Sequence, residues 1–311
     1  MNEMMKQPLF ILILSLVVLA ACKSGNGQTA ADEAERPLIT VTIEPLRYFT
    51  EAIAGERFRV VSMVPKGSSP ETYDPTPAQL VALAESKAYL RIGHIGFEQT
   101  WADRLADNAP HLPFFDTSRG IDLIHEEHTH QHTEEADAHA GHAHHHSGGV
   151  EPHVWNSAVN ARIIAGNVLQ ALCSIDPAGR ETYVAHHDSL CRCIARVDSL
   201  VRQQLSSPDA DRAFLIYHPA LSYFAREYGL RQISIEKEGK EPSPARLKQL
   251  VDECKAQGIR IIFVQPEFDR RNAELIARQT GTRIVSIHPL SYDWEEEMLN
   301  VAAQLGQPSV H

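Results

Sequence analysis

Hydrophobic residues in the first third of the chain form short runs that alternate with helical patterns. Three runs rich in β-branched or aromatic residues, at 38–43, 58–64 and 88–92, predict strands. Thr76 and Pro77 then begin a helix that extends to Ser86, with a hydroxyl cap and proline at its first position. Strands that alternate with helices predict a parallel sheet covered by helices, so the fold class is α/β.

The last third of the chain repeats this pattern. Strands are predicted at 213–218, 231–235, 260–265 and 283–288. Helices begin near Pro219, at Ser243-Pro244 and near Arg271, and Gly281 ends the last of them. The sequence therefore predicts two α/β lobes.

A long amphipathic segment separates the two lobes. A helix begins at Asp176-Pro177 and continues to about Leu205. Its apolar stripe consists of Val184, His187, Leu190, Ile194, Val197, Val201 and Leu205. At about 1.5 Å per residue such a helix is roughly 40 Å long, the length of a whole small domain. We expect it to connect the lobes as a stiff joint that permits only small lobe movements, and the alternative is a long helix packed within one lobe.

The N-terminus has the pattern of an export signal. Lys6 precedes an apolar run at 9–21 that is too short to span a bilayer and closes on Leu-Ala-Ala-Cys. This ending resembles a bacterial lipobox, which implies cleavage after a signal peptide at 1–21 and lipidation of Cys22. A plain signal peptide that happens to contain a cysteine is the alternative. Residues 22–36 have the composition of a flexible tether.

These patterns give a domain plan with a lobe at 37–175, a connecting helix at 176–206 and a lobe at 207–311.

The net charge of −11 argues against nucleic acid as a partner. Four cysteines remain in the mature chain, Cys173, Cys191, Cys193 and Cys254. Their even number permits disulfides in an oxidising compartment, but their spacing is not that of a zinc finger.

A histidine-rich tract lies inside the first lobe. Between residues 125 and 149 the chain has nine histidines interleaved with acids: His125, His128, His130, His132, His139, His142, His144, His145 and His146. The tract has no apolar face to bury, so we expect a disordered loop, and its imidazoles indicate low-affinity metal binding. A tolerated low-complexity insertion or a cloning tag is the alternative, although a tag normally lies at a terminus.

Four further residues are candidate metal ligands. His218 and His288 each end a predicted strand and each precede a proline. Ligands of parallel α/β sheets gather at the carboxyl ends of strands. Glu71 follows the 58–64 strand through a turn-rich segment, and His153 lies in Glu-Pro-His-Val-Trp directly after the histidine-rich tract. We therefore predict a cleft to which each lobe supplies two ligands.

Several longer motifs surround these residues. They are the segments at 64–77 (VPKGSSPETYDPTP), 151–155 (EPHVW), 217–230 (YHPALSYFAREYGL), 241–244 (EPSP) and 288–290 (HPL). In this order, from about Thr40 to the C-terminus, they resemble the signatures of the zinc/manganese solute-binding proteins of bacterial ABC transporters (cluster A-I, class III), in particular the zinc type with a histidine-rich loop.

This resemblance implies two lobes joined by a single long helix, with a metal buried in the cleft between them. It also implies a lipid-anchored extracytoplasmic protein that delivers its metal to a membrane permease driven by an ATPase, and that acts as a monomer without performing catalysis. Many zinc-type members carry a histidine-rich loop just before the second ligand, where this tract lies.

The resemblance also assigns ligands. His153 and His218 match the second and third ligand histidines of the family. Glu71 stands where zinc-type members usually have histidine, and His288 stands where the family usually has aspartate, so this chain exchanges the carboxylate and the imidazole between lobes. Water, Asp293 or another carboxylate in place of Glu71 is the alternative. With one negative ligand, we expect an additional acid beside the site.

Three histidines and one carboxylate suit tetrahedral Zn²⁺, whereas manganese sites favour more oxygen and usually have a carboxylate at position 218. We therefore expect a high-affinity zinc-binding transport protein. The alternatives are a manganese- or iron-binding member of the same family, or a metal-buffering or adhesive surface lipoprotein. A zinc hydrolase would need a catalytic signature, and the chain contains no His-Glu-x-x-His sequence, so we do not expect an enzyme.

Overall fold

The computed structural model of the chain describes residues 36–125, 149–237 and 239–307. These residues comprise the two lobes, the helix that connects them and the two ends of the histidine-rich tract. The predicted signal peptide, the lipidation site Cys22 and nearly all of the predicted tether lie outside the described residues. So do all histidines of the tract except His125.

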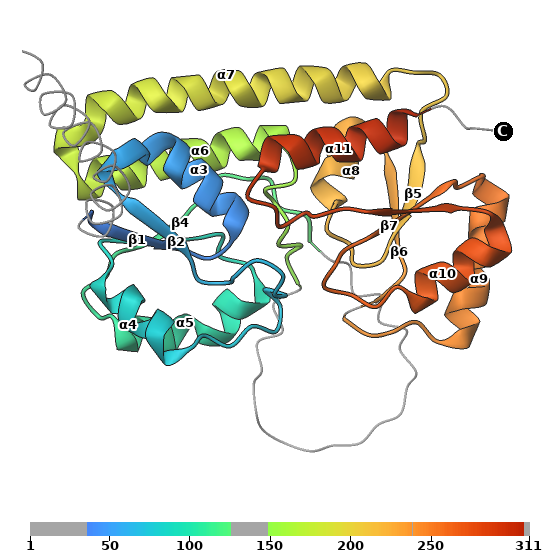
Figure 1. Cartoon of the computed structure of the whole chain (residues 1–311), viewed down its shortest axis with the longest axis horizontal. Helices are drawn as coiled ribbons and strands as arrows, with labels where there is room; N and C mark the ends of the chain where they lie inside the picture. The colour runs from blue at the N-terminus through green and yellow to red at the C-terminus, as the bar shows by residue number, and fades with distance from the viewer. Residues whose placement is uncertain (1–35, 126–148, 238, 308–311) are drawn as a thin grey trace, which may run out of the picture.

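The first lobe contains a four-stranded parallel sheet in the order β2-β1-β3-β4. Its strands are β1 (Leu38–Val41), β2 (Arg59–Ser62), β3 (Tyr89–Arg91) and β4 (Phe114–Asp116), and its helices include α3 (Glu44–Ala54), the short 3-10 turn η1 (Gly55–Arg57), α4 (Pro77–Glu85) and α5 (Gly96–Asn108). Helix α3 lies on one side of the sheet, and α4 and α5 lie on the other (Figure 1). The three predicted strands are confirmed, but β4 was missed because a run of three residues, Phe-Phe-Asp, is too short to show a strand pattern.

The second lobe repeats this topology with a parallel sheet in the order β6-β5-β7-β8. Its strands are β5 (Ala213–Ile216), β6 (Arg231–Ser234), β7 (Ile261–Val264) and β8 (Arg283–Ser286), and its helices are α8 (Ser222–Tyr228), α9 (Pro244–Gln257), α10 (Arg271–Thr280) and α11 (Trp294–Gly306). All four predicted strands are confirmed. Gly281 ends α10 with a φ of 74°, a backbone conformation that glycine adopts without strain.

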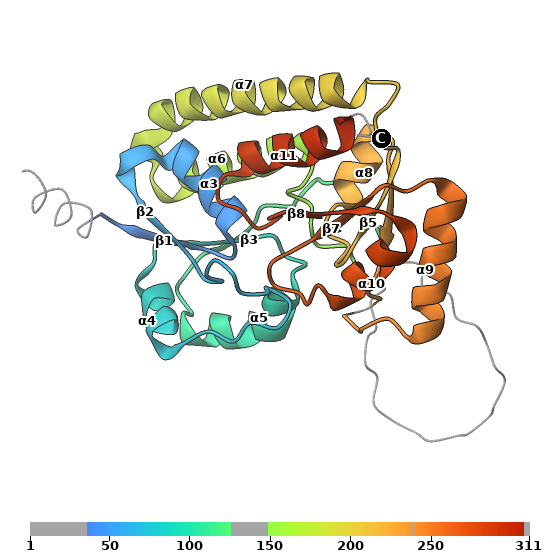
Figure 2. The same cartoon turned by 45° about the vertical axis from the view of Figure 1, so that its right-hand side comes forward.

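The long helix α7 (Arg180–Leu205) connects the lobes as predicted, after α6 (Ala158–Ile175) and a 3-10 turn, η2 (Pro177–Gly179). It extends along one side of both lobes and packs against α6 and α3 of the first and α11 of the second (Figures 1 and 2). Helix α6 is apolar enough to cross a membrane by length and composition, but it packs against α3 and α7 and contributes to the core.

The predicted apolar stripe of α7 needs a correction at its first turn. Val184 is 40% exposed and His187 is only partly buried, whereas Tyr183 is fully buried. Tyr183 lies seven residues before Leu190, which is two helical turns, so it shares the inward face with the rest of the stripe. Its hydroxyl donates to Asp176 and accepts from Arg57, so the polar end of this buried side chain has hydrogen-bond partners.

Two buried tryptophans join the lobes directly. Trp155 Nε1 donates to the Pro289 carbonyl at 2.7 Å, and Trp294 Nε1 donates to the Trp155 carbonyl at 2.8 Å. Both side chains are at most 2% exposed and belong to one core cluster that includes residues of both lobes. The interface between the lobes is therefore fixed by buried polar bonds as well as by α7. Small rather than wide lobe movements remain our prediction.

The described residues contain no disulfide. Cys173 lies on α6, Cys191 and Cys193 lie on α7, and Cys254 is buried on α9, and all four are free thiols. The even number of cysteines permitted pairing, but the fold does not bring these four side chains together.

Candidate metal centre

Loops that follow the carboxyl ends of the strands converge between the two lobes. In the second lobe, His218 lies two residues after β5, Glu236 lies two residues after β6, and Gln265 follows β7 directly. In the first lobe, Glu71 lies in the loop between β2 and α4. The strand order places the switch points of the sheets between β1 and β3 and between β5 and β7, where open α/β sheets bind ligands.

Three of the four predicted ligands come together there. Glu71, His153 and His218 each offer one ligand atom, and these atoms all lie within 4.8 Å of one another. The two Nε2 atoms of His153 and His218 are 3.1 Å apart. Two nitrogens that bind one tetrahedral zinc at about 2.0–2.1 Å lie about 3.3 Å apart. The cluster thus has dimensions that fit a single small divalent ion.

Each imidazole is oriented by a buried carboxylate. Glu151 Oε1 lies 2.6 Å from His153 Nδ1, and Glu236 Oε1 lies 2.6 Å from His218 Nδ1. An ionised carboxylate can only accept, so each Nδ1 donates, and in a neutral ring each Nε2 then turns a lone pair toward the other. Two lone pairs that face each other repel unless a proton or a metal ion lies between them, so metal binding would displace any proton shared by the two rings. These carboxylates are the additional acids that we expected beside the site.

Burial and charge act in opposite directions on the first of these pairs. Burial raises the pKa of Glu151, but the adjacent His153 outweighs burial and holds that pKa below its usual range. Burial lowers the pKa of His153, and Glu151 overcomes this, so the pKa of the imidazole lies above its usual range. The carboxylate is therefore ionised at neutral pH and able to hold the Nδ1 proton.

Glu71 presents a carboxylate oxygen that lacks a donor. Its Oε2 accepts from the Gly96 backbone N–H at 3.2 Å, at the start of α5, where the helix dipole favours negative charge. Its Oε1 is buried and has no hydrogen-bond partner in the described part of the chain. Buried polar atoms are almost always satisfied, so an unpartnered anionic oxygen beside two imidazole nitrogens fits a cation.

Gly96 leaves the space that Glu71 occupies. A Cβ at this position would lie 2.5 Å from Glu71 Oε2 and 3.0 Å from the Glu71 carbonyl oxygen. Because one of these contacts is with backbone, a side-chain rotation cannot relieve both. Gly96→Ala should therefore displace Glu71 and weaken metal binding by at least about tenfold, which a competition titration measures. Gly166→Ala is the matched control, since nothing lies within 4 Å of its added Cβ. Equal affinities in the two variants would contradict this role of Glu71.

His218 is also held through its backbone and its ring. Gln265 Nε2 donates to the His218 carbonyl at 2.7 Å, and the His218 N–H donates to Gln265 Oε1. The Phe268 ring stacks on the imidazole with 5.0 Å between ring centres. Sequence reasoning assigned no role to Glu236, Gln265 or Phe268. Glu236 and Gln265 follow strand ends, so the rule that identified His218 would also have found them.

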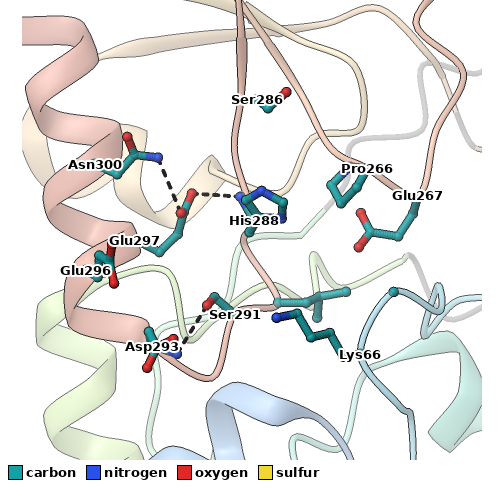
Figure 3. Close-up of a pocket in the computed structure, with 12 residues that line it drawn as sticks. Lys66, Pro266, Glu267, Ser286, His288, Ser291, Asp293, Glu296, Glu297 and Asn300 are labelled. Carbon is teal, nitrogen blue, oxygen red and sulfur yellow. Dashed lines mark hydrogen bonds between the residues drawn. The ribbon is translucent and has the colours of Figure 1, made fainter.

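His288 does not join the three-residue cluster. It is exposed after β8, and its backbone N–H donates to Glu297 Oε1 at 2.8 Å. Its side chain lines a pocket of about 620 Å³ that Lys66 and Glu267 also border (Figure 3). Asp293, the alternative to Glu71, is exposed and lines the same pocket, so it does not take the place of Glu71.

The two ends of the histidine-rich tract meet beside the cluster. His125 is exposed and forms an antiparallel bridge with Val150, and the Glu151 N–H donates to the Ile124 carbonyl at 2.9 Å. The Tyr223 hydroxyl of the second lobe accepts from the Ile124 N–H and donates to the Glu151 carbonyl. The tract therefore begins and ends next to the residue that orients His153.

Two parallel-sheet lobes, one long connecting helix and a partly buried Glu/His cluster between the lobes define a metal-binding solute-binding protein of the kind that serves ABC transporters. The chain belongs to the family described as zinc-uptake complex component A, periplasmic, whose model matches residues 39–304.

Solved structures and curated relatives agree on this family. The crystal structure of ZnuA is 33% identical, has a TM-score of 0.78, and covers 88% of this chain and 98% of its own. The high-affinity zinc uptake system protein ZnuA of Bacillus subtilis is 25% identical and covers 93% of this chain and 90% of its own. The manganese ABC transporter substrate-binding lipoprotein PsaA of Streptococcus mitis is 26% identical and covers 89% of this chain and 86% of its own.

Family membership determines the class of activity but not the metal. These proteins are extracytoplasmic substrate-binding components of ABC transporters and not enzymes, so this chain is a metal-binding transport protein. Relatives of similar identity are named for zinc, manganese or iron, the last being MtsA of Streptococcus pyogenes at 27% identity. The identity of the metal must therefore be inferred from the ligands.

Proposed function

We propose that this protein captures Zn²⁺ with high affinity outside the cytoplasmic membrane and delivers it to the permease of an ABC transporter. The observation that carries the proposal is the cluster of Glu71, His153 and His218, with two imidazole nitrogens 3.1 Å apart. In this proposal Zn²⁺ is the transported substrate, and the three side chains are its ligands.

The ligand chemistry favours zinc over manganese. Two neutral imidazoles and one carboxylate provide a nitrogen-rich, low-coordination set, which suits Zn²⁺, whereas Mn²⁺ prefers carboxylate, carbonyl and water oxygens. Glu151 and Glu236 hold both imidazoles in the tautomer that presents Nε2. Glu71 neutralises one of the two positive charges of the ion, and the same two acids offset the charge that remains.

His288 is proposed as the fourth ligand. It lies two residues beyond β8 and its side chain borders the pocket between the lobes, so ligation requires this exposed imidazole to turn toward the cluster. His288→Ala should weaken zinc binding if the imidazole ligates. Unchanged affinity would indicate instead that water completes the coordination.

The carboxylate behind His218 should matter almost as much as a ligand. Glu236→Gln keeps the shape of the side chain but removes the charge that holds the Nδ1 proton. We expect zinc affinity to fall by about 10- to 100-fold, as is usual when an outer partner of a ligand is lost. Glu241→Gln, at an exposed position nearby, provides the matched control and should bind zinc as the wild type does. Wild-type zinc affinity in the Glu236→Gln variant would contradict this role of Glu236.

Two features outside the described residues complete the proposal. Lipidation of Cys22 would anchor the protein to a bacterial membrane, and Cys22→Ser should then release it into the soluble fraction. The histidine-rich tract would act as a low-affinity collector that raises the local concentration of zinc, or as a sensor of plentiful zinc, because its paired ends lie beside Glu151. Equal zinc uptake with and without residues 125–149, in scarce and abundant zinc, would contradict both roles of the tract.

Zinc titration of the chelated mature chain tests the proposed function. One tight site should appear first, followed by weaker sites that disappear when residues 125–149 are deleted. Weak sites alone would instead support a metal-buffering surface lipoprotein.

A further inference from the structure

The aromatic neighbours of the two ligand histidines have no role in the proposed function. The Phe268 ring lies almost parallel to the His218 imidazole, with an angle of 18° between the ring planes. The Trp155 ring lies beside His153, with 5.2 Å between ring centres. Each imidazole therefore has an apolar ring as a neighbour in addition to the carboxylate on its Nδ1.

Phe268 is held in this position by its own loop. Its backbone N–H donates to the Gln265 carbonyl, and Gln265 also binds both backbone groups of His218. The Phe268 ring packs against Tyr217, with 5.5 Å between ring centres, and against the core of the second lobe. One short loop after β7 therefore fixes the His218 backbone and covers a face of its ring.

This loop also borders the pocket between the lobes. Pro266 and Glu267, which precede Phe268, line the pocket of about 620 Å³ between the lobes. Phe268 is half-buried and turns its ring to His218 instead. An apolar ring at this place offers no hydrogen bond to a water molecule, and ordered water requires polar partners.

We propose that Phe268 is a specificity-determining residue, which excludes water from the His218 side of the metal and so restricts the ion to few ligands. This inference rests on the proposed metal-binding function. Zn²⁺ accepts four-coordinate tetrahedral geometry, whereas Mn²⁺ favours octahedral coordination by oxygen. A site that excludes additional water therefore discriminates against manganese through geometry and not only through its ligand atoms.

Three proteins test the proposal: the wild type, Phe268→Ala and Phe268→Leu, each lacking residues 125–149. Zinc and manganese affinities are measured by competition, and the visible spectrum of bound Co²⁺ reports the coordination number. The wild type and Phe268→Leu should give the intense absorption of tetrahedral Co²⁺. Phe268→Ala should admit water, give the weaker absorption of a five- or six-coordinate ion, and lower the zinc-to-manganese affinity ratio by about tenfold or more.

The possible failures are distinguishable. A wild type that binds neither zinc nor Co²⁺ would overturn the proposed function itself. An unchanged ratio and spectrum in Phe268→Ala would overturn the role of Phe268 while leaving that function intact. An equal loss of zinc and manganese affinity in Phe268→Ala, with the tetrahedral spectrum retained, would also overturn it, because Phe268 would then only position His218.

Discussion

Replacement of His218 by alanine should abolish tight zinc binding while leaving the fold intact. His218 contributes one of the two converging Nε2 atoms, and its removal leaves His153 and Glu71 as the remaining ligands of the described cluster. Removal of a direct ligand eliminates a coordinate bond, so we expect affinity to fall by more than about 100-fold, beyond the loss that follows removal of an outer partner.

His111→Ala is the matched control for this variant. His111 is an exposed histidine outside the cluster, so its removal should leave zinc affinity unchanged. Both variants are compared by zinc titration after deletion of residues 125–149, with circular dichroism as a check of folding. If the folded His218→Ala variant kept wild-type zinc affinity, the cluster would not be the binding site.

Replacement of Trp294 by alanine should cause a large loss of stability. Its ring is 2% exposed and packs against Phe49 and Tyr48, and its Nε1 binds the Trp155 carbonyl. Loss of a buried tryptophan costs about 3–5 kcal/mol, and the Trp155 carbonyl would lose its indole donor as well. We therefore expect a decrease of about 3–5 kcal/mol in the free energy of unfolding, measured with urea in the presence of a chelator so that metal binding does not contribute.

Trp101→Ala provides the control for this measurement. Trp101 is partly exposed, and its Nε1 bonds Asp74 at the surface. Its loss should cost much less than the loss of Trp294. Similar costs for both variants would show that the buried interface between the lobes contributes little to the stability of the protein.

The sequence predicted the two lobes and most of their strands well because these strands are short apolar runs bounded by turns. The strands predicted at 213–218 and 283–288 correspond to β5 and β8 and end two residues later than the observed strands. Strand β4 was not predicted because its three residues are too few to show a strand pattern. On α7, one stripe position was assigned wrongly because Tyr183 and Val184 are adjacent and both satisfy approximate helical spacing.

From strand positions, the sequence could predict only those ligands that lie just after the end of a strand. His218 follows β5 and joins the cluster, as expected. His288 follows β8 by the same two residues, yet it faces another pocket, because a strand end fixes where the backbone lies and not where the side chain points. Glu236 follows β6 and could have been found by the same rule, whereas the contact of Glu151 with His153, two residues away, depends on side-chain direction, which periodicity does not reveal.

Metal retention by the mature chain lacking residues 125–149 tests the central claim most directly. The protein is stripped with a chelator, dialysed against equal zinc and manganese, and analysed for both metals beside His218→Ala in the same background. One equivalent of zinc that disappears in His218→Ala is the predicted result. Retained manganese would contradict the assignment of the metal, and no retained metal would contradict the binding role of the cleft.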